Sequence, residues 1–157
     1  MKWGAFSGIS PPSLTPRFEG VCSTVVVPYG RPSVSIAVKR VYEPAAKSDG
    51  YRVLVDRIWP RGLKKEDAAL DIWARELAPS TALREWFGHD PARWECFRHR
   101  YASELDARKT FWRPLVVQAE RHRVTLLFGA KDEEHNQAVA LKMYLDSWIK
   151  ANGCVSA

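Results

Sequence analysis

Tyr51-Arg-Val-Leu-Val-Asp-Arg-Ile-Trp-Pro-Arg-Gly62 is the stretch that decides the fold, because a short apolar run in it ends abruptly in ionic and aromatic residues. This run, Val53 to Val55, is rich in β-branched residues and too short for a globular helix, so it predicts a buried strand. Trp59-Pro60 then leaves the sheet, since proline has no N–H donor. Ligands of open α/β sheets usually bind at the carboxyl ends of the strands, which is where this stretch places Asp56, Arg57, Trp59 and Arg61. The alternative is a structural ion pair between Asp56 and Arg57 beside a core tryptophan.

The composition predicts a single folded domain. The chain has 157 residues, of which 46% are hydrophobic, enough for one domain of ordinary size. Seven Trp, six Phe and five Tyr residues exceed what a disordered chain carries, so a packed core is expected. The net charge of +6 favours anionic partners such as phosphates, nucleotides or nucleic acid, without identifying one of them.

The cysteine pattern argues against a metal or disulfide framework. Cys22, Cys96 and Cys154 are odd in number and widely spaced, so neither paired disulfides nor a zinc site is indicated. A reducing cytoplasm fits this pattern. No apolar run approaches the ~20 residues of a membrane helix, and the N-terminus lacks the apolar centre of a signal peptide. We therefore expect a soluble cytoplasmic protein with no membrane partner.

Proline and glycine set the expected domain boundaries. Five prolines interrupt residues 1–34, which predicts a disordered extension; the alternatives are a short edge strand at residues 24–27 and an over-long gene start. Residues 35–152 are expected to form one compact α/β domain, with a small, largely parallel or mixed sheet and flanking helices. Residues 153–157 are expected to be a C-terminal tail.

Two further strands and five helices are predicted around the central strand. The strands are residues 36–42, where apolar and polar positions alternate, and the apolar run 123–129. About eight residues follow the first strand, fewer than a usual parallel crossover, which leaves the relative direction of the first two strands open. Apolar spacing predicts helices at 64–77, 81–87, 90–105, 111–121 and 133–152. Ser80, Asp90 and Asp132 fit as their N-caps and Gly88 and Gly153 as their ends, whereas Pro114 fits only a first turn.

Five sequence blocks carry a resemblance to a known family. They are Lys39-Arg-Val-Tyr42, the block from Gly50 to Gly62, Leu77-Ala-Pro-Ser80, Trp86-Phe-Gly-His-Asp90 and Leu126-Leu-Phe-Gly-Ala-Lys-Asp-Glu-Glu-His-Asn136. In this order they resemble the YeaO-like branch of the DUF488 family, over about residues 36–149. The resemblance implies a compact α/β fold. It implies no activity, because the biochemical role of the family is not established.

A sister branch of the same family differs at the start of the last helix. It carries Cys-His-Arg where this chain has Asn136-Gln137-Ala138. A thiolate beside a cation would suit phosphate or acyl chemistry. Since the thiol, the imidazole and the guanidinium are all missing from these positions, a thiol mechanism cannot be carried over.

An anion site is predicted where two buried strands end. Asp56 and Arg57 follow one strand, and the segment from Lys131 to Asn136 follows another. If these strands are adjacent, both groups reach one rim, where the amides opening the last helix also favour negative charge. An arginine there could hold a phosphate in bidentate fashion. The candidate ligand-binding residues are Lys39, Arg57, Trp59, Arg61, His89, Lys131 and Asn136.

Histidine is the natural candidate for proton transfer near neutral pH. His135 is the predicted proton carrier, with Asp56 or Asp132 orienting it or acting as a base. The alternative for His135 is a capping or core-edge histidine bonded to backbone. His89 is a second candidate, and its alternative is a local hydrogen bond in the Gly-His-Asp-Pro turn.

Three functions fit these observations. The first is binding of a phosphorylated or nucleotide-like small anion, with hydrolase or transferase activity as its catalytic form. The second is a non-catalytic nucleic-acid-binding module, favoured by the net charge and the many arginines. The third is an adaptor whose exposed aromatic residues dock a protein partner. No motif indicates a cofactor, a metal or an oligomeric state.

Overall fold

The fold is a four-stranded parallel sheet with helices, seen in a computed structural model that describes residues 34–153. The strands are β1 (Ile36–Arg40), β2 (Tyr51–Leu54), β3 (Ile72–Trp73) and β4 (Val124–Phe128). Their order in the sheet is β1-β4-β2-β3. The predicted α/β class is therefore confirmed, whereas the predicted extension before Val34 and the residues after Gly153 lie outside the described part of the chain.

The direction of the first two strands, left open by the sequence, is now settled. Strands β1 and β2 each pair in parallel with β4, which lies between them. The connection between them crosses β4 and contains a 3-10 turn, η2 (Lys47–Asp49). The carbonyl of Asp49 accepts a hydrogen bond from the Thr125 hydroxyl of β4 at 2.6 Å. This hydrogen bond ties the short crossover to the strand that it crosses.

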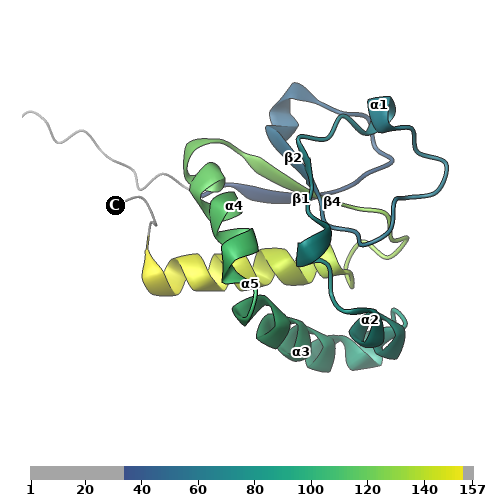
Figure 1. Ribbon diagram of the computed structural model, residues 1–157, viewed down its shortest axis with the longest axis vertical. Coiled ribbons are helices and arrows are strands. Elements are labelled where there is room, and N and C mark those ends of the chain that lie inside the picture. The colour runs from purple at the N-terminus through teal and green to yellow at the C-terminus, as the bar shows by residue number, and fades with distance from the viewer. Residues whose placement is uncertain (1–33, 154–157) are drawn as a thin grey trace, which may run out of the picture. The chain divides into compact units, whose positions relative to one another are not determined.

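Four helices lie on one side of the sheet, and a short helix with loops covers the other face (Figure 1). The helices of the first face are α2 (Thr81–Phe87), α3 (Trp94–Asp106), α4 (Lys109–Arg121) and α5 (Gln137–Asn152). Their core packs on β-strand residues such as Val53, Val124 and Leu126. On the other face, a smaller apolar cluster of Val41, Leu54 and Leu127 is covered by Trp59, Leu63, Leu70 and Trp73.

The predicted helix at 64–77 is wrong. Helix α1 covers only Lys65–Ala68, and Ala69 ends it in the left-handed region at φ 44°. Asp71 then fastens the chain to β2, because its amide donates to the Arg52 carbonyl and its carboxylate accepts from the Arg52 amide. Strand β3 and a 3-10 turn, η3 (Arg75–Leu77), replace the rest of the helix. Pairing with the open edge of β2 satisfies the hydrogen-bonding groups of the backbone. Apolar periodicity could not predict this pairing, because it depends on residues distant in the sequence.

Several predicted helix ends are confirmed. The Ser80 hydroxyl accepts from the Leu83 amide, and Gly88 ends α2 in the left-handed region. The Asp90 carboxylate accepts from the Ala92 amide at 2.9 Å and so caps a 3-10 turn, η4 (Pro91–Arg93), which leads into α3. Gly153 ends α5 as expected. These positions were predictable because each cap depends on residues within one turn of the chain.

Two expectations about the later helices need correction. The N-cap of α5 is Asn136, whose side chain accepts from the Val139 amide, because Asp132 instead caps the preceding turn through the amides of Glu134 and His135. Helix α4 begins at Lys109, so Pro114 lies beyond its first turn. Thr110 and Pro114 are both exposed, so water can bond to the carbonyl that the proline leaves without a donor.

Candidate functional site

Asp56 joins the ends of two neighbouring strands to the start of the last helix. It follows β2, and its Oδ2 accepts a hydrogen bond of 2.8 Å from the amide of Gly129, which follows β4. Its Oδ1 accepts a hydrogen bond from the Gln137 side-chain amide at the beginning of α5. The predicted meeting of the two strand ends at one rim is therefore present, although Gln137 was not expected to take part.

Burial makes Asp56 an unusual carboxyl group. Desolvation raises its pKa from 3.8 to about 6, although hydrogen bonds from Gly129 and Gln137 and the charges of Arg84 and His89 favour the ionised form. At neutral pH the group is mostly ionised, and a fall of about one pH unit protonates much of it. Such a pKa is typical of a functional site in a cleft.

A small cavity opens beside Asp56. Its volume is about 200 Å³, and its polar side chains are Asp56, Arg57, Arg84, His89 and Gln137. Its walls are apolar, with contributions from Val55, Ile58, Phe87 and Phe97. We call this the Asp56 cavity. It is smaller than the roughly 300–1,000 Å³ of drug-sized pockets, so its occupant would be a small molecule or one end of a larger one.

Three predicted site residues line this cavity. They are Asp56, Arg57 and His89. The described residues contain no ion pair between Asp56 and Arg57, and the Arg57 side chain is exposed. His89 adopts a left-handed φ of 56°, and its ring centroid lies 5.6 Å from that of Phe87. This places the imidazole at the edge of the apolar wall.

The predicted proton carrier lies elsewhere. His135 Nδ1 is 3.1 Å from Asp132 Oδ2, and the ring meets Trp94 edge-on at 5.3 Å between centroids. The amide of His135 holds the pKa of Asp132 below its usual value, outweighing the opposing effect of desolvation. Neither residue lines the Asp56 cavity. The structure therefore brings His135 together with Asp132 and not with Asp56.

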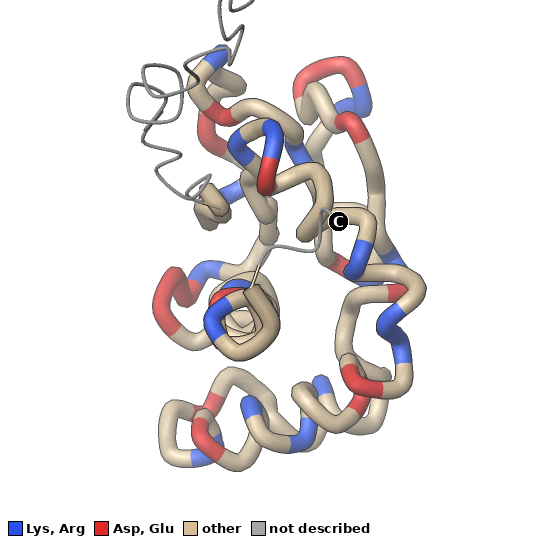
Figure 2. Tube along the Cα trace, turned by 90° about the vertical axis from the view of Figure 1, so that its left-hand side faces the viewer, with Lys and Arg blue, Asp and Glu red and all other residues tan. Residues whose placement is uncertain are grey.

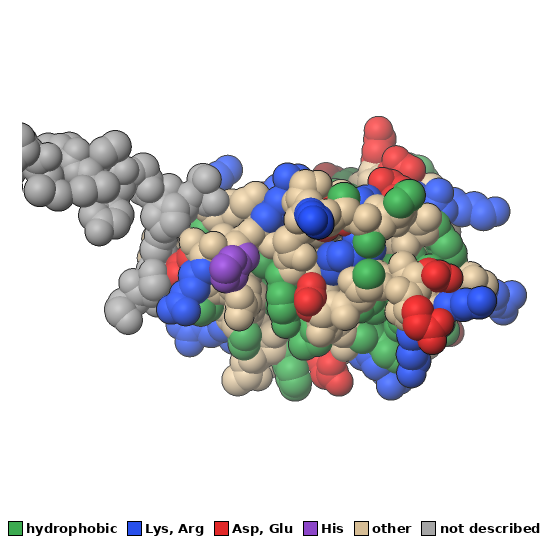
Figure 3. Space-filling view, turned by 90° about the horizontal axis from the view of Figure 1, so that it is seen from above, with side chains coloured by type: hydrophobic (Ala, Val, Ile, Leu, Met, Phe, Trp, Pro, Cys, Tyr) green, Lys and Arg blue, Asp and Glu red, His purple; other side chains and the backbone are tan. Residues whose placement is uncertain are grey.

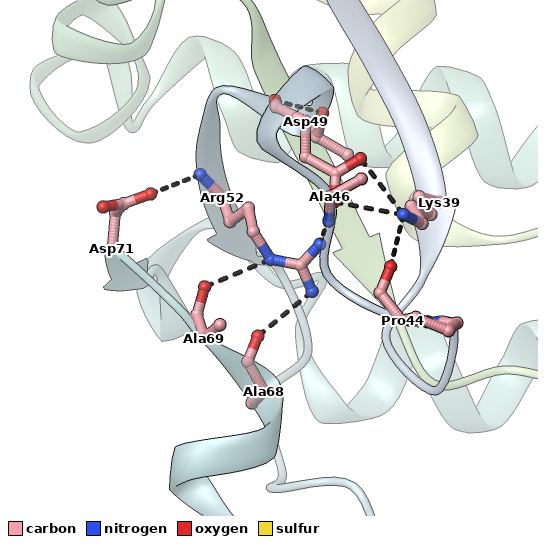
Figure 4. Close-up of polar contacts among 9 residues, drawn as sticks. Lys39, Pro44, Ala46, Asp49, Arg52, Ala68, Ala69 and Asp71 are labelled. Carbon is pink, nitrogen blue, oxygen red and sulfur yellow. Dashed lines mark hydrogen bonds and ion pairs between the residues drawn. The ribbon is translucent and has the colours of Figure 1, made fainter.

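Asn136 and Lys39 occupy structural positions. Asn136 is buried, and its side-chain oxygen caps α5, while its side-chain Nδ2 donates to the Asp132 backbone carbonyl at 3.0 Å. Lys39 Nζ bonds to the Asp49 carboxylate at 3.1 Å and to the Pro44 carbonyl at 2.8 Å, within a polar cluster that also contains Arg52 (Figure 4). Both polar groups are thus engaged by the fold, away from the Asp56 cavity lining.

The remaining predicted ligand residues do not converge on the cavity. Trp59 donates from Nε1 to the Leu63 carbonyl at 2.7 Å and meets Trp73 edge-on at 5.3 Å between centroids. Arg61 and Lys131 are exposed, and the Arg61 carbonyl accepts from the Tyr42 hydroxyl at 3.0 Å. None of the three lines the Asp56 cavity. Trp59 therefore serves the smaller apolar cluster, and the two cations lie on the surface.

Sequence reasoning missed Arg84 and Gln137. Both line the cavity, and both influence Asp56. Arg84 is carried by α2, three residues before the buried Phe87, but nothing distinguishes it in sequence from the other helical arginines. Gln137 had one signal, because it replaces the middle residue of the Cys-His-Arg sequence in the sister branch.

Basic and acidic residues are mixed along the chain (Figure 2) and on the face of the molecule seen from above (Figure 3). Basic and acidic positions are interspersed along the chain in Figure 2. The face seen in Figure 3 likewise carries Lys and Arg side chains among acidic and hydrophobic ones, without one continuous basic field. Within residues 34–153, no group of three potential metal ligands occurs and no helix is long and apolar enough to cross a bilayer.

Replacing Gly129 by alanine tests how tightly the Asp56 carboxylate is held. The new Cβ would lie 2.9 Å from Asp56 Oδ2 and 3.5 Å from two carbons of Pro60, so the carboxylate must move away from the Gly129 amide. We expect a loss of about 1–3 kcal/mol, as for overpacking, measured by denaturant unfolding. In an Asp56→Ala background the same change should cost much less. An equal cost in both backgrounds would contradict this role for Gly129.

The fold and the cavity define a small α/β domain with a small cavity of mixed polar and apolar lining at the carboxyl ends of a parallel sheet. The chain belongs to the DUF488 family: the family model described as the inactive DUF488-N3 subclade matches residues 35–155. It is 45% identical to the uncharacterized protein YeaO of Escherichia coli strain K12 over 114 residues, which are 73% of this chain and 99% of YeaO. The uncharacterized protein Rv3073c of Mycobacterium tuberculosis strain H37Rv is 46% identical over 96 residues, covering 55% of this chain and 81% of that protein. No solved structure gives a significant match.

Proposed function

We propose that this protein binds a small phosphorylated or nucleotide-like anion in the Asp56 cavity. One observation carries the proposal: two arginines, Arg57 and Arg84, line a cavity of about 200 Å³ that also contains apolar walls and the partly buried Asp56 carboxylate. A guanidinium pairs with phosphate through two parallel hydrogen bonds. The Asp56 carboxylate would accept N–H or O–H donors from the rest of the ligand, such as a base or a sugar.

The proposal is for binding without turnover. The cavity lining contains no Ser, Thr, Cys or Lys residue that could act as a nucleophile. The matching family model carries the description inactive, and the Cys-His-Arg sequence of the sister branch is missing here. Hydrolase or transferase activity would need Asp56 or His89 to activate water or a ligand hydroxyl. The Asp132–His135 pair lies outside the lining and receives no chemical role. A cytoplasmic location, which the cysteine pattern favours, belongs to the same proposal.

Replacing Arg84 by glutamine tests the proposed site. We would titrate the full chain calorimetrically with inorganic phosphate, ribose 5-phosphate and adenosine 5′-monophosphate. If Arg84 contacts the phosphate, the variant should bind about 10- to 100-fold more weakly, the scale of a lost charge-assisted hydrogen bond. Arg121→Gln is the matched control, because Arg121 is exposed at the end of α4 and does not line the cavity. Unchanged affinity in Arg84→Gln, or no binding of any probe, would refute the proposal.

A further inference from the structure

A second cavity shares the lining residue Arg57 with the first and is richer in arginine. It has a volume of about 310 Å³ and is lined by Arg57, Arg75, Glu76, Arg108 and Phe111. We call it the Arg75 cavity. Arg57 lines both cavities, so the two cavities are neighbours at this side chain. Three guanidinium groups against one carboxylate make this second cavity attractive to further negative charge.

Two of its arginines are held in place by the protein. Arg108 donates from Nη1 to the carbonyls of Glu76 at 2.9 Å and Ala78 at 2.8 Å, and its Nη2 lies 3.9 Å from Glu104 Oε2, so the guanidinium group is fixed. The Arg75 guanidinium lies over the Trp73 ring, 4.8 Å from its centroid. Because these side chains are already ordered, an anion that binds them loses less side-chain entropy.

The cavity also carries an exposed aromatic side chain. Phe111 is 51% exposed, although it is one of the large apolar residues of the domain. Exposed aromatic rings beside arginines that follow a phosphate backbone are the usual platform for single-stranded nucleic acid. A duplex does not suit the first cavity, because a base can enter so small a space only when it is unpaired and unstacked.

We infer that the occupant of the Asp56 cavity is one nucleotide of a single-stranded nucleic acid, whose neighbouring phosphates lie across the Arg75 cavity and whose next base stacks on Phe111. This inference rests on the proposed function and gives it a substrate class. The chain binds the strand through an unpaired nucleotide in one cavity and the backbone in the next.

The test compares a mononucleotide with a strand. Thymidine 5′-monophosphate and a fluorescein-labelled oligothymidylate of about ten nucleotides would be titrated into the full chain. We expect the strand to bind at least ~10-fold more tightly, since stacking adds to phosphate contacts. Arg75→Gln and Phe111→Ser should each weaken the strand about 5- to 10-fold and leave the mononucleotide unchanged. Arg75→Gln should also reduce the slope of log affinity against log salt by about 0.7, the value for one phosphate contact on a single strand.

Controls separate the sources of negative charge. Phe111→Trp, which keeps an aromatic ring, should bind the strand as tightly as the parent does, unlike Phe111→Ser. Arg121→Gln should leave strand binding unchanged. Arg75 and Phe111 are exposed, so their variants should melt like the parent. The inference would be overturned if inorganic polyphosphate bound as tightly as the strand and with the same affinity to the parent and to Phe111→Ser. A polyglutamate peptide of equal affinity would also overturn it and would assign the surface to an acidic protein segment.

The outcomes distinguish this inference from the proposed function. If the mononucleotide binds and depends on Arg84 but the strand binds no more tightly, the inference fails and the proposed function stands. If Arg84→Gln leaves both ligands unaffected, the Asp56 cavity is not the binding site and both fail. Loss of strand binding in Arg75→Gln and Phe111→Ser, together with loss of both ligands in Arg84→Gln, supports both.

Discussion

Replacing Arg52 by alanine should destabilise the domain more than any other single change considered for it, by about 3–5 kcal/mol, the cost of breaking a buried ion pair. Arg52 is buried, and its guanidinium forms an ion pair with Asp49 and donates to the carbonyls of Ala68 and Ala69, each at 3.1 Å. Hydrogen bonds and the ion pairs with Lys39 and Arg52 hold the pKa of Asp49 below its usual value despite desolvation, which opposes them. Alanine would leave this carboxylate with Lys39 as its remaining ion-pair partner and the Ala46 amide as a donor, and it would leave the two carbonyls without their Arg52 donor.

Thermal melting of the full chain measures this effect. A loss of this size should lower Tm by roughly 10 °C or more for a domain of this length. Arg121→Ala is the matched control and should change stability by no more than about 0.5 kcal/mol, because it removes an exposed arginine. If Arg52→Ala melted within a degree or two of the parent, the polar cluster would not be a main support of β2.

The second large effect is a pH-dependent gain in stability from Asp56→Asn. Burial raises the pKa of Asp56 from 3.8 to about 6 in the folded protein, so ionising this group opposes folding. This difference corresponds to about 3 kcal/mol. Asparagine removes the charge and can still accept from the Gly129 amide, while a rotated Gln137 amide can accept from its NH2 group. At pH 7 the variant should therefore be more stable than the parent by up to about 3 kcal/mol.

The sign of the pH dependence follows from proton binding. Between pH 4 and pH 6 the folded parent binds the Asp56 proton more strongly than the unfolded chain, so its stability falls as the pH rises through this window. Below about pH 4 the group is protonated in both states, and parent and variant should unfold alike. Asp49 and Asp132, whose pKa values are lowered, act in the opposite direction but equally in both proteins. Denaturant unfolding at several pH values would contradict the prediction if the difference stayed constant from pH 4 to pH 7.

Local sequence signals were sufficient for most elements. The strands at β1, β2 and β4, the caps at Ser80 and Asp90 and the helix end at Gly88 were all predictable, because each depends on residues a few positions apart. The predicted helix at 64–77 was wrong because its local periodicity is outweighed by distant contacts. Asp71 and β3 pair with β2, from which they are well separated in sequence. Of the two interpretations of Asp56 and Arg57, the structural ion pair is not formed, and the buried ion pair of this region joins Arg52 to Asp49.

The sequence by itself determined that this protein is an α/β domain of the DUF488 type, and that Asp56 and Arg57 stand where a buried strand ends. Only the tertiary structure decided which partners those residues have. It placed Arg84 and His89 of the α2 region beside Asp56, added Gln137 from α5, and kept His135 with Asp132. The reason is physical: a strand end is set by neighbours along the chain, whereas a cavity is set by which surfaces pack across the sheet, and residues such as Arg84 and Gln137 acquire their role only from that packing.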